Sequence, residues 1–416
     1  MQIVDIRITP VAVPDMPLLN TKGVHGAYFL RSIIEVECDD GTIGLGETYG
    51  AIKTLDGLRT VAPHLIGLDP FHLNDLRRRI DAALPDAGGI NHKTMLAQHQ
   101  VVDVVYSAFE IPCLDIQGHA TGRSVSDLLG GALHDEVSFA AYLFFKFAKP
   151  DDQPGEDFFG EVMTPDAMVA QAEVFVARHG FRSLKLKGGV LEPDLEIETM
   201  LKLRQRFPDH PLRIDPMGAW RVPTAKRVCD ALDGVLEYLE DPVRGMDAMA
   251  ELAAQTMMPL STNLVVVEFD QVFEAFSKSA LHIILSDHHY WRGATGARQL
   301  GKMCEAAGMG VSMHSNTHLG ISLAAMTHVA ASTPNLTYDC DTHYPWTNHD
   351  VIEGGKWVFK DGALPVPKGP GLGVRLDHGA MAELHDMYLA QATLDRNDTD
   401  EIKRYIPDYV RQVPRW

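Results

Sequence analysis

The feature of this sequence that most constrains its fold is a series of short apolar runs, each closed by a polar residue, at a nearly regular interval. The closing residues follow one another 23 to 28 positions apart. One strand, one helix and two short loops occupy about that length. Strands that alternate with helices in this way predict parallel βαβ units. The closing residues are Lys187, Asp215, Glu240, Asn263, Asp287, His314 and Asp341.

Seven such units, with a first strand near residues 137–145, predict an α/β fold in which residues 135–370 form a modified (β/α)-barrel of the TIM type. An open doubly wound sheet would use the same elements. Such a sheet usually carries a glycine-rich phosphate turn, and the nearest match, GLGETYG at residues 44–50, has neither the spacing nor the strand-to-helix context. The barrel is therefore the favoured architecture.

Residues 1–134 follow a different pattern, which predicts a smaller α+β unit. Alternating apolar residues on both sides of residues 39–41 predict a hairpin. Apolar residues at helical spacing predict helices over residues 73–83 and 101–119. The tail from residue 371 is polar, but its apolar side chains predict that it docks onto the rest of the chain. These side chains are Tyr405, Ile406 and Tyr409.

The overall charge of the chain excludes some classes of partner. The 416 residues carry a formal net charge of −19, whereas nucleic acids and anionic membranes need a basic surface. No apolar stretch has the length of a membrane span, and the N-terminus lacks the pattern of a signal peptide. The five scattered cysteines are typical of free thiols in a reducing compartment. We therefore expect a cytoplasmic protein that binds neither nucleic acid nor membrane.

The closing residues should meet at one face, because the carboxyl ends of all strands in a parallel barrel lie together. Asp215, Glu240 and Asn263 close three successive strands and supply two carboxylates and an amide oxygen. Oxygen ligands of this kind suit Mg²⁺. Each residue alone has an ordinary interpretation as a helix cap or a loop residue. Their shared register predicts a metal site.

Lys185 and Lys187 lie two residues apart on one predicted strand, so both ammonium groups point to the same side. Two cations that are so close repel each other. This repulsion predicts a lowered pKa for at least one lysine, and therefore a base that works near neutral pH. A solvated strand end is the ordinary alternative for a Lys-x-Lys pair.

His314 and Asp287 close neighbouring strands, which predicts a carboxylate beside an imidazole. A carboxylate that orients an imidazole and supports its charged form is typical of a general acid/base histidine. The chain has 19 histidines, so chance pairs are common. We interpret His288 and His289 as structural or exposed.

Taken in this order, these residues resemble the mandelate racemase branch of the enolase superfamily. The asparagine among the metal ligands resembles the glucarate dehydratase family within that branch. The similarity extends over essentially the whole chain. It is carried by the segments LKLKGGVL, DPMGAW, EDP, STNL, HSNTHLGISLAAMTHVAA, DTH and KGPGLGVRLD, and by residues 20–25, 142–145 and 396–407.

The resemblance implies a role for each of these residues. Residues 1–134, joined by the tail at residues 371–416, would form a capping domain over the barrel. Asp215, Glu240 and Asn263 would hold Mg²⁺. Lys187 and His314 would be the acid/base pair, with Asp287 supporting His314. The substrate would contact Asn20, His25, Thr94, Tyr142, Phe144, Lys185, Asn316, His343 and Arg396.

The reaction implied by the resemblance is the dehydration of an acid sugar, D-glucarate or a related aldarate, to 5-dehydro-4-deoxy-D-glucarate. Mg²⁺ and Lys185 would stabilise an enediolate after Lys187 or His314 removes the proton next to the carboxylate. His314 would then help the β-hydroxyl to leave. We also expect a homo-oligomer.

Two departures from the family pattern leave other readings open. Met217 stands where the family has asparagine, and residues 146–160 are longer and more polar than the family pattern. One alternative is an epimerase or racemase of a hydroxy acid on the same scaffold. The other is a weakly active paralogue that binds a partner.

Overall fold

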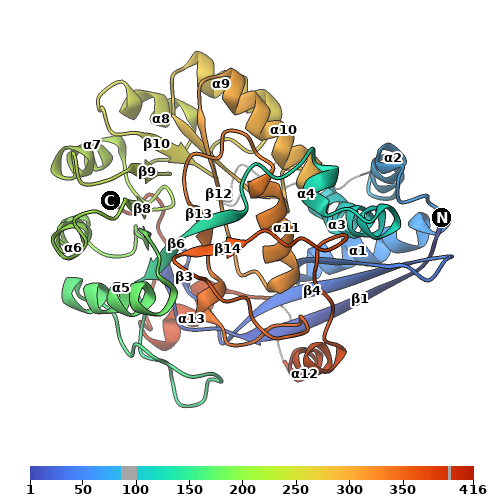
Figure 1. Cartoon of the computed structure of the whole chain (residues 1–416). Coiled ribbons are helices and arrows are strands. Elements are labelled where there is room, and N and C mark those ends of the chain that lie inside the picture. The colour runs from blue at the N-terminus through green and yellow to red at the C-terminus, as the bar shows by residue number, and fades with distance from the viewer. Residues whose placement is uncertain (86–100, 392–394) are drawn as a thin grey trace.

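The structure is a computed structural model that describes residues 1–85, 101–391 and 395–416. These residues form a barrel with a smaller unit packed against one side of it (Figure 1). Thr94, predicted to contact the substrate, lies outside the described residues. Within the described ranges, none of the helices combines the length and the apolar character that crossing a bilayer requires.

Parallel strands in chain order form the barrel. From β6 to β12 each strand pairs with the next one, and β13 pairs with β6. Between β12 and β13 the seam is held by the N–H of Thr337, which donates to the carbonyl of Val311 over 3.1 Å. The described strands of the barrel are β6 (Glu136–Phe144), β7 (Ser183–Lys187), β8 (Leu212–Asp215), β9 (Tyr238–Glu240), β10 (Leu260–Thr262), β11 (Ile283–Ser286), β12 (Gly310–Met313) and β13 (Cys340–Thr342).

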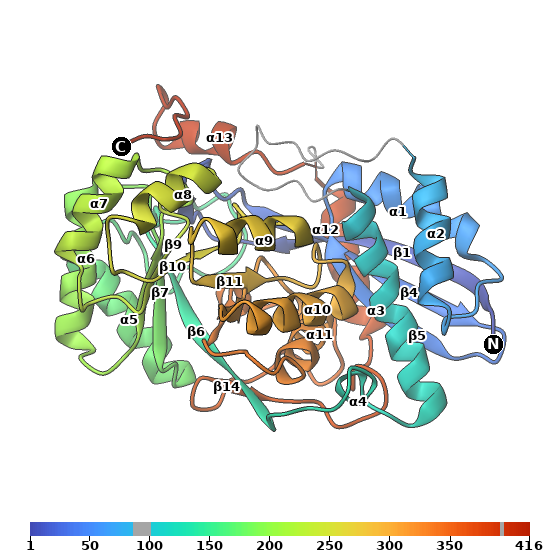
Figure 2. The ribbon, with the colours of Figure 1, turned by 90° about the horizontal axis from the view of Figure 1, so that it is seen from above.

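A helix follows every strand from β6 to β12 and covers the outside of the barrel (Figure 2). Proline lies in the first turn of α5, α6 and α7, where its fixed φ suits a helix start. The helices are α5 (Pro165–His179), α6 (Pro193–Arg206), α7 (Val222–Ala231), α8 (Met246–Ala253), α9 (Phe269–Ser277), α10 (Gly293–Ala306) and α11 (Gly320–Ala331). After β13, the described chain instead forms the 3₁₀ helix η1 (Tyr344–Trp346) and the strand β14 (Ala363–Pro365), antiparallel to β6. The predicted modified barrel is confirmed.

Strand β7 separates the inside of the barrel from the helices. Leu184 and Leu186 belong to the main hydrophobic core. Because successive side chains of a strand point to opposite faces, Lys185 and Lys187 point to the other side. The predicted orientation of this strand is therefore confirmed.

An antiparallel sheet in the order β1–β4–β5 forms the centre of the smaller unit. The predicted hairpin is the β4–β5 pair. The two predicted helices correspond to α2 and α3, whereas α1 lies outside the prediction. A second hydrophobic core fills the space between this sheet and its helices. The elements are β1 (Ile3–Pro14), β2 (Leu19–Asn20), β3 (Gly23–Val24), β4 (Tyr28–Cys38), β5 (Ile43–Tyr49), α1 (Ile52–Leu65), α2 (Leu73–Ala83), α3 (Val101–Thr121) and α4 (Val125–Leu128).

The C-terminal tail packs first on the smaller unit and then crosses to the barrel (Figure 2). The ring of Tyr405 stacks on Phe147 with 4.4 Å between the ring centroids, and Tyr409 packs against the main core. The predicted docking is confirmed for these two side chains, but it is wrong for Ile406, which is 44% exposed. The tail contains α12 (His378–Leu389), α13 (Asp398–Glu401) and the 3₁₀ helix η2 (Ile402–Arg404).

The division of the chain into residues 1–134 with 371–416 and residues 135–370 stays a prediction. We propose it because β6, the first barrel strand, begins at Glu136. The end of the tail also reaches the barrel itself, since the N–H of Arg221 donates to the carbonyl of Trp416 over 2.7 Å.

Buried carboxylates of the smaller unit cap two barrel helices. Glu110 of α3 accepts the N–H of Ala294, in the first turn of α10, over 2.6 Å. Glu47 of β5 accepts the N–H of Leu319, at the start of α11, over 2.8 Å. A helix N-terminus has unpaired N–H groups and a partial positive charge, so a carboxylate is a favourable partner there. Gly293 permits the contact with Glu110, because a Cβ at that position would lie 1.8 Å from the carboxylate oxygen.

We expect Glu110→Ala to destabilise the protein by about 1–3 kcal/mol, because buried N–H groups of α10 would lose their acceptor. The shift of the urea unfolding midpoint measures the effect. Glu198→Ala removes an exposed carboxylate of α6 and serves as the control, with an expected change below about 0.5 kcal/mol. Equal midpoints for the two variants would contradict the capping role of Glu110.

Candidate active site

The predicted site residues lie together at the carboxyl end of the barrel. Lys187, Asp215 and Glu240 are the last residues of β7, β8 and β9. Asn263, Asp287 and His314 each directly follow the next three strands. All six side chains are buried or nearly so. The register read from the sequence therefore corresponds to a shared location in space.

The two lysines of β7 contact carboxylates from neighbouring strands. Lys185 Nζ lies 2.6 Å from Glu240 and 2.5 Å from Asp341. Lys187 Nζ lies 2.5 Å from Asp215. Asp341 was recognised in the sequence only as a strand end, and its contact with Lys185 depends on the closure of the barrel between β13 and β6.

The predicted lowering of a lysine pKa by lysine–lysine repulsion is wrong for this arrangement of side chains. Burial lowers the pKa of Lys185, but Asp341 and Glu240 outweigh burial and hold that pKa well above its usual value. Burial also lowers the pKa of Lys187, and Asp215 together with Tyr142 and Glu240 more than offsets it. Lys185 does oppose the charge of Lys187, but its effect is smaller than that of Asp215.

The carboxylates outnumber the lysines at this end of the barrel. One ligand atom from each of Asp215, Glu240 and Asp241 lies within 4.8 Å of the others. Burial, together with repulsion from Asp215, Asp341 and Asp241, raises the pKa of Glu240 well above its usual range, although Lys185 opposes the rise. Such a group of buried carboxylates is stabilised when a cation joins it.

The donor atoms fit a hard divalent cation. Glu240 Oε1 is buried and has no hydrogen-bond partner among the described residues. A buried carboxylate oxygen without a partner costs free energy, which a bound cation would offset. Asn263 adds an amide oxygen, and its backbone N–H donates to Asp241 over 2.9 Å. Carboxylate and amide oxygens are the ligands that Mg²⁺ prefers.

Asp241 is a functional residue that the sequence analysis missed. It directly follows Glu240 and holds the next strand end, because its carboxylate accepts from Thr262 Oγ1 as well as from the Asn263 backbone. Its φ of 40° is uncommon for a residue with a side chain. The only available signal was the acidic pair Glu240–Asp241 in the segment EDP.

Met217 has an unusual backbone conformation next to Asp215. Its φ is 48°, in the left-handed region that asparagine adopts more readily than methionine. Its N–H donates to Asp215 over 2.9 Å, which orients that carboxylate. Its thioether lies 3.8 Å from the hydroxyl of Thr21 in the smaller unit. The departure from the family pattern therefore changes a side chain that lies beside the carboxylates.

The predicted contact between His314 and Asp287 is present. His314 Nδ1 lies 3.2 Å from Asp287 Oδ2 and 3.4 Å from the hydroxyl of Tyr290. The other oxygen of Asp287 lies 2.7 Å from His289 Nδ1. Burial raises the pKa of Asp287, but His289 and His314 outweigh burial and hold that pKa well below its usual range. His288 and His289 are both buried, which excludes the exposed alternative of their interpretation and leaves the structural one.

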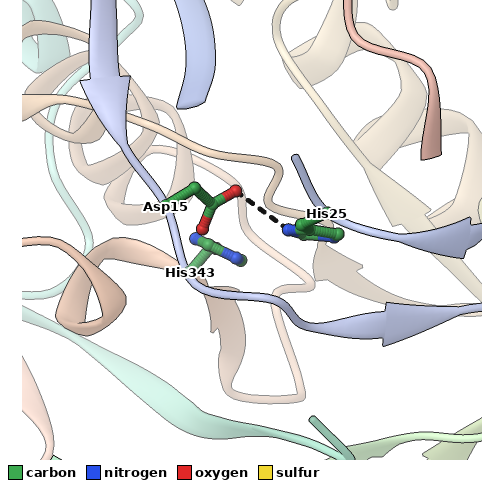
Figure 3. A group of neighbouring side chains, drawn as sticks. All are labelled: Asp15, His25 and His343. Atoms are coloured by element: carbon green, nitrogen blue, oxygen red, sulfur yellow. Dashed lines mark hydrogen bonds and ion pairs between the residues drawn. The ribbon is translucent and has the colours of Figure 1, made fainter. Parts of the chain in front are cut away.

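A second polar group is built from His25, His343 and Asp15 (Figure 3). The buried carboxylate of Asp15 lies 2.9 Å from His25 Nδ1 and 3.9 Å from the guanidinium of Arg396. Burial lowers the pKa of His343 to about 3, so this ring is neutral at physiological pH. Asp15 was missed in the sequence, because nothing in the local pattern separates it from a turn residue.

The tail supplies the remaining polar contacts of this group. Arg396 pairs with Asp398, and Asn20 Nδ2 donates to the same carboxylate over 2.8 Å. Gly23 lets the two segments approach each other, because a Cβ there would lie 2.0 Å from the carbonyl of Asp398. The structure therefore brings together Asn20 and Arg396, which are 376 residues apart in the sequence.

Aromatic residues of β6 connect the two polar groups. Tyr142 lies under Lys185, with 4.8 Å between Nζ and the ring centroid. Its ring contacts Phe144 at 4.6 Å, and Phe144 contacts the ring of His343 at 5.6 Å. The lysine–carboxylate group and the Asp15 group are thus parts of one continuous site.

Asn316 lies between the barrel and the smaller unit. Its side-chain amide donates to the hydroxyl of Tyr49, in β5, over 2.8 Å. Asn316 follows His314 by two residues, and Tyr49 also hydrogen bonds to Asp287. Asn316, one of the predicted substrate contacts, therefore lies on the same side of the site as His314.

Two family descriptions match most of the chain. Residues 3–130 match "Mandelate racemase / muconate lactonizing enzyme, N-terminal domain", and residues 167–380 match "Enolase C-terminal domain-like". The chain belongs to the enolase superfamily. A probable glucarate dehydratase of Streptomyces coelicolor is 46% identical to it, over 100% of this chain and 99% of that protein. This superfamily member is therefore an enzyme of the dehydratase or isomerase kind.

Solved structures of this superfamily resemble the protein closely. An enolase from Mycobacterium smegmatis, complexed with tartrate, is 49% identical with a TM-score of 0.95, and covers 100% of this chain and 98% of its own. An enolase from Pseudomonas fluorescens, with bound magnesium, potassium and tartrate, is 45% identical with a TM-score of 0.96, and covers 100% of this chain and 99% of its own.

We expect Asp241→Asn to stabilise the metal-free enolase-superfamily fold at pH 8 by about 1–3 kcal/mol. Burial and Asp215 raise the pKa of Asp241 to about 7, above its value in the unfolded chain. The folded state therefore loses stability as the pH rises through that range. Asparagine carries no charge, and its side-chain oxygen can still accept the N–H of Asn263, whereas its amide nitrogen cannot accept from Thr262 Oγ1.

Urea unfolding in the presence of EDTA at several pH values measures this effect. The advantage of Asp241→Asn should shrink steadily as the pH falls toward 4, where both states bind the proton. Asp56→Asn, at an exposed position of α1, is the matched control and should show no such pH dependence. A pH-independent difference would contradict the charge argument.

Proposed function

We propose that the protein is a Mg²⁺-dependent dehydratase of an acid sugar, D-glucarate or a related aldarate, that forms 5-dehydro-4-deoxy-D-glucarate. The observation that carries the proposal is the pair of lysines on β7 beside a group of buried carboxylates, with the His314–Asp287 pair in the same site. Similarity to the probable glucarate dehydratase of Streptomyces coelicolor over the whole chain supports the choice of substrate class.

Asp215, Glu240 and Asn263 would hold Mg²⁺. The buried oxygen of Glu240 that lacks a partner supports this role, as does the magnesium bound in a structural relative. When bound there, Mg²⁺ supplies positive charge that stabilises negative charge developing on the oxygens of a substrate carboxylate. Asp241 would keep Asn263 in place through its backbone N–H.

Lys185 would bind a substrate carboxylate oxygen, because its ammonium group is held at the centre of the site by Glu240 and Asp341. Lys187 would accept or hold the proton of the carbon next to that carboxylate. Its raised pKa depends on its contact with Asp215, whose charge a cation held there would offset. His314 is the second candidate for accepting this proton. Which of the two residues removes the proton depends on the configuration of that carbon.

Water would leave with the help of His314 as an acid. The proton removed from the carbon stays on the base, and the β-hydroxyl takes a proton from the imidazole and departs as water. The resulting enol then tautomerises to the ketone. Asp287 supports the charged imidazole through the contact with His314 Nδ1.

The Asp15 group would bind the far end of the substrate. Arg396 supplies positive charge and His25 a polarised ring, which suits a second carboxylate. A dicarboxylate would thus be held at both ends of the continuous site. The other contacts that we propose are made by Asn20, Tyr142, Phe144, Asn316, His343 and Thr94. The cytoplasmic location and the homo-oligomer stay predictions.

We expect Lys187→Met and His314→Asn each to reduce the kcat of dehydration at least about 100-fold, because each removes a proton-transfer group. The measurement is the formation of the keto product by purified protein with Mg²⁺. A panel of aldarates and aldonates serves as candidate substrates. Lys202→Met removes a lysine on the outer helix α6 and is the control.

Near-normal turnover in both active-site variants would exclude this mechanism. The epimerase alternative makes a different prediction for the wild-type protein. It would incorporate solvent deuterium into the recovered substrate without forming the keto product. The weakly active paralogue would bind the aldarate and turn it over orders of magnitude more slowly than ordinary enzymes.

Chelation should stop turnover, and added Mg²⁺ should restore it. We also expect the apparent affinity for Mg²⁺ to rise with pH, because the raised pKa of Glu240 means that a proton competes with the cation at low pH. Titration of the metal-free protein with Mg²⁺ at several values between about pH 5.5 and pH 8 tests whether the affinity rises with pH. Turnover that persists in EDTA would rule out the metal role.

A further inference from the structure

A continuous row of buried polar side chains runs from the sheet of the smaller unit to His314. Glu47 Oε1 lies 2.7 Å from Arg31 Nε, and Arg31 Nη2 lies 3.0 Å from His289 Nε2. His289 Nδ1 lies 2.7 Å from Asp287, whose other oxygen lies 3.2 Å from His314. Arg31 and Glu47 belong to β4 and β5, whereas the other three residues follow barrel strands.

The contacts with Arg31 and Asp287 determine which ring nitrogen of His289 carries the proton. A guanidinium has only donors, so His289 Nε2 must accept when it bonds to Arg31. Arg31 Nη2 also lies 3.0 Å from Ser322 Oγ, which accounts for its second N–H, and the same hydroxyl lies 3.0 Å from His289 Nε2. The proton of the neutral ring is therefore on Nδ1, where it is donated to Asp287.

The ring of His289 is enclosed on all sides by described residues. Arg31 and Ser322 face Nε2, and Asp287 faces Nδ1. The aromatic neighbours are Tyr49 at 5.1 Å, His288 at 4.1 Å and His318 at 4.9 Å between centroids. Burial lowers the pKa of His288 and of His318 well below the usual value.

We propose that Arg31 and His289 are positioning residues for the His314–Asp287 pair, an inference that rests on the acid/base role proposed for that pair. Arg31 keeps Nε2 of His289 an acceptor, so that His289 donates its Nδ1–H to one oxygen of Asp287. The carboxylate is thereby held in orientation, and its negative charge remains available to His314. Tyr49 and Tyr290 are the other titratable groups that face this pair.

The smaller unit would then do more than close the site. Glu47 holds Arg31 and also caps α11 through the N–H groups of Leu319 and Ser322, both at 2.8 Å. A displacement of β4 and β5 would therefore separate Arg31 from His289. In this way the placement of the cap determines whether the acid/base pair is in its working arrangement.

The first test compares the Mg²⁺-loaded full chain with its Arg31→Met variant. The limb of the kcat–pH profile that disappears in His314→Asn belongs to His314. In Arg31→Met this limb should move to lower pH by about half a unit or more, because an Asp287 carboxylate that His289 no longer orients supports the charged imidazole of His314 less well. The value of kcat should fall while KM changes much less. An unchanged limb in a folded Arg31→Met protein would overturn the proposal.

A second pair of variants keeps the test decisive if Arg31→Met does not fold. His289→Asn places an amide N–H where Nδ1 lies and cannot ionise, so kcat should stay within about threefold of the wild type. His289→Leu lacks the donor, and kcat should fall about 10- to 100-fold, as when other outer contacts of a catalytic group are removed. Equal kcat values for the two variants would overturn the proposal.

His328→Leu is the matched control for the loss of a buried histidine. Its ring bonds to the carbonyl of Leu372 and to the N–H of Ser126, away from the site. This variant should lower thermal stability without moving the pH profile. A shift as large as that of Arg31→Met would mean that the profile reports general destabilisation, and would overturn the proposal.

Nitrogen-15 NMR of the histidine rings separates this inference from the proposed function. In the wild type, His289, assigned from His289→Asn, should carry its proton on Nδ1. In Arg31→Met the chemical shifts of its ring nitrogens should change, because Nε2 has lost the guanidinium donor. A wild-type ring protonated on Nε2 would overturn the inference. Failure to dehydrate any aldarate, with the expected NMR result, would count against the proposed function alone.

Discussion

The working end of this barrel depends on an excess of buried carboxylates over buried cations. Asp215, Glu240 and Asp241 lie close together, and two lysines from β7 offset only part of their charge. Burying so many carboxylates is costly unless cations join them. The same imbalance that makes this arrangement costly also suits it to a divalent cation. Stability and function therefore depend on one electrostatic constraint.

Buried carboxylates also hold the smaller unit against the barrel. Glu110 and Glu47 each place a buried carboxylate at the N-terminus of a barrel helix, so the interface is set by charge and hydrogen bonding as well as by apolar packing. Glu47 also holds Arg31, which contacts His289. The interface that fixes the cap is thus continuous with the side chains that orient Asp287. A shift of the smaller unit would therefore change the contacts of Asp287 and, through it, of His314.

The barrel could be predicted from the sequence because its register is local. Each strand is short, ends in or directly before a polar residue and is followed by a helix, and that pattern repeats from Lys187 to His314. Helix α1 escaped the prediction because Gly57 and Pro63 interrupt its helical pattern. The roles of Asp15 and Asp241 were not predicted for another reason. In the sequence, each resembles an ordinary acidic loop residue, and only the structure shows the partner that it contacts.

The sequence by itself determined the fold class and the order in which lysines, carboxylates and a histidine close successive strands. Only the tertiary structure decided their electrostatics. Asp341 lies next to Lys185 because the barrel closes, and this contact reverses the predicted lowering of the lysine pKa. Arg31 reaches His289 because two units pack together. The physical reason is that periodicity is encoded over a few neighbouring residues, whereas the field at a buried charge is the sum over groups far apart in the chain.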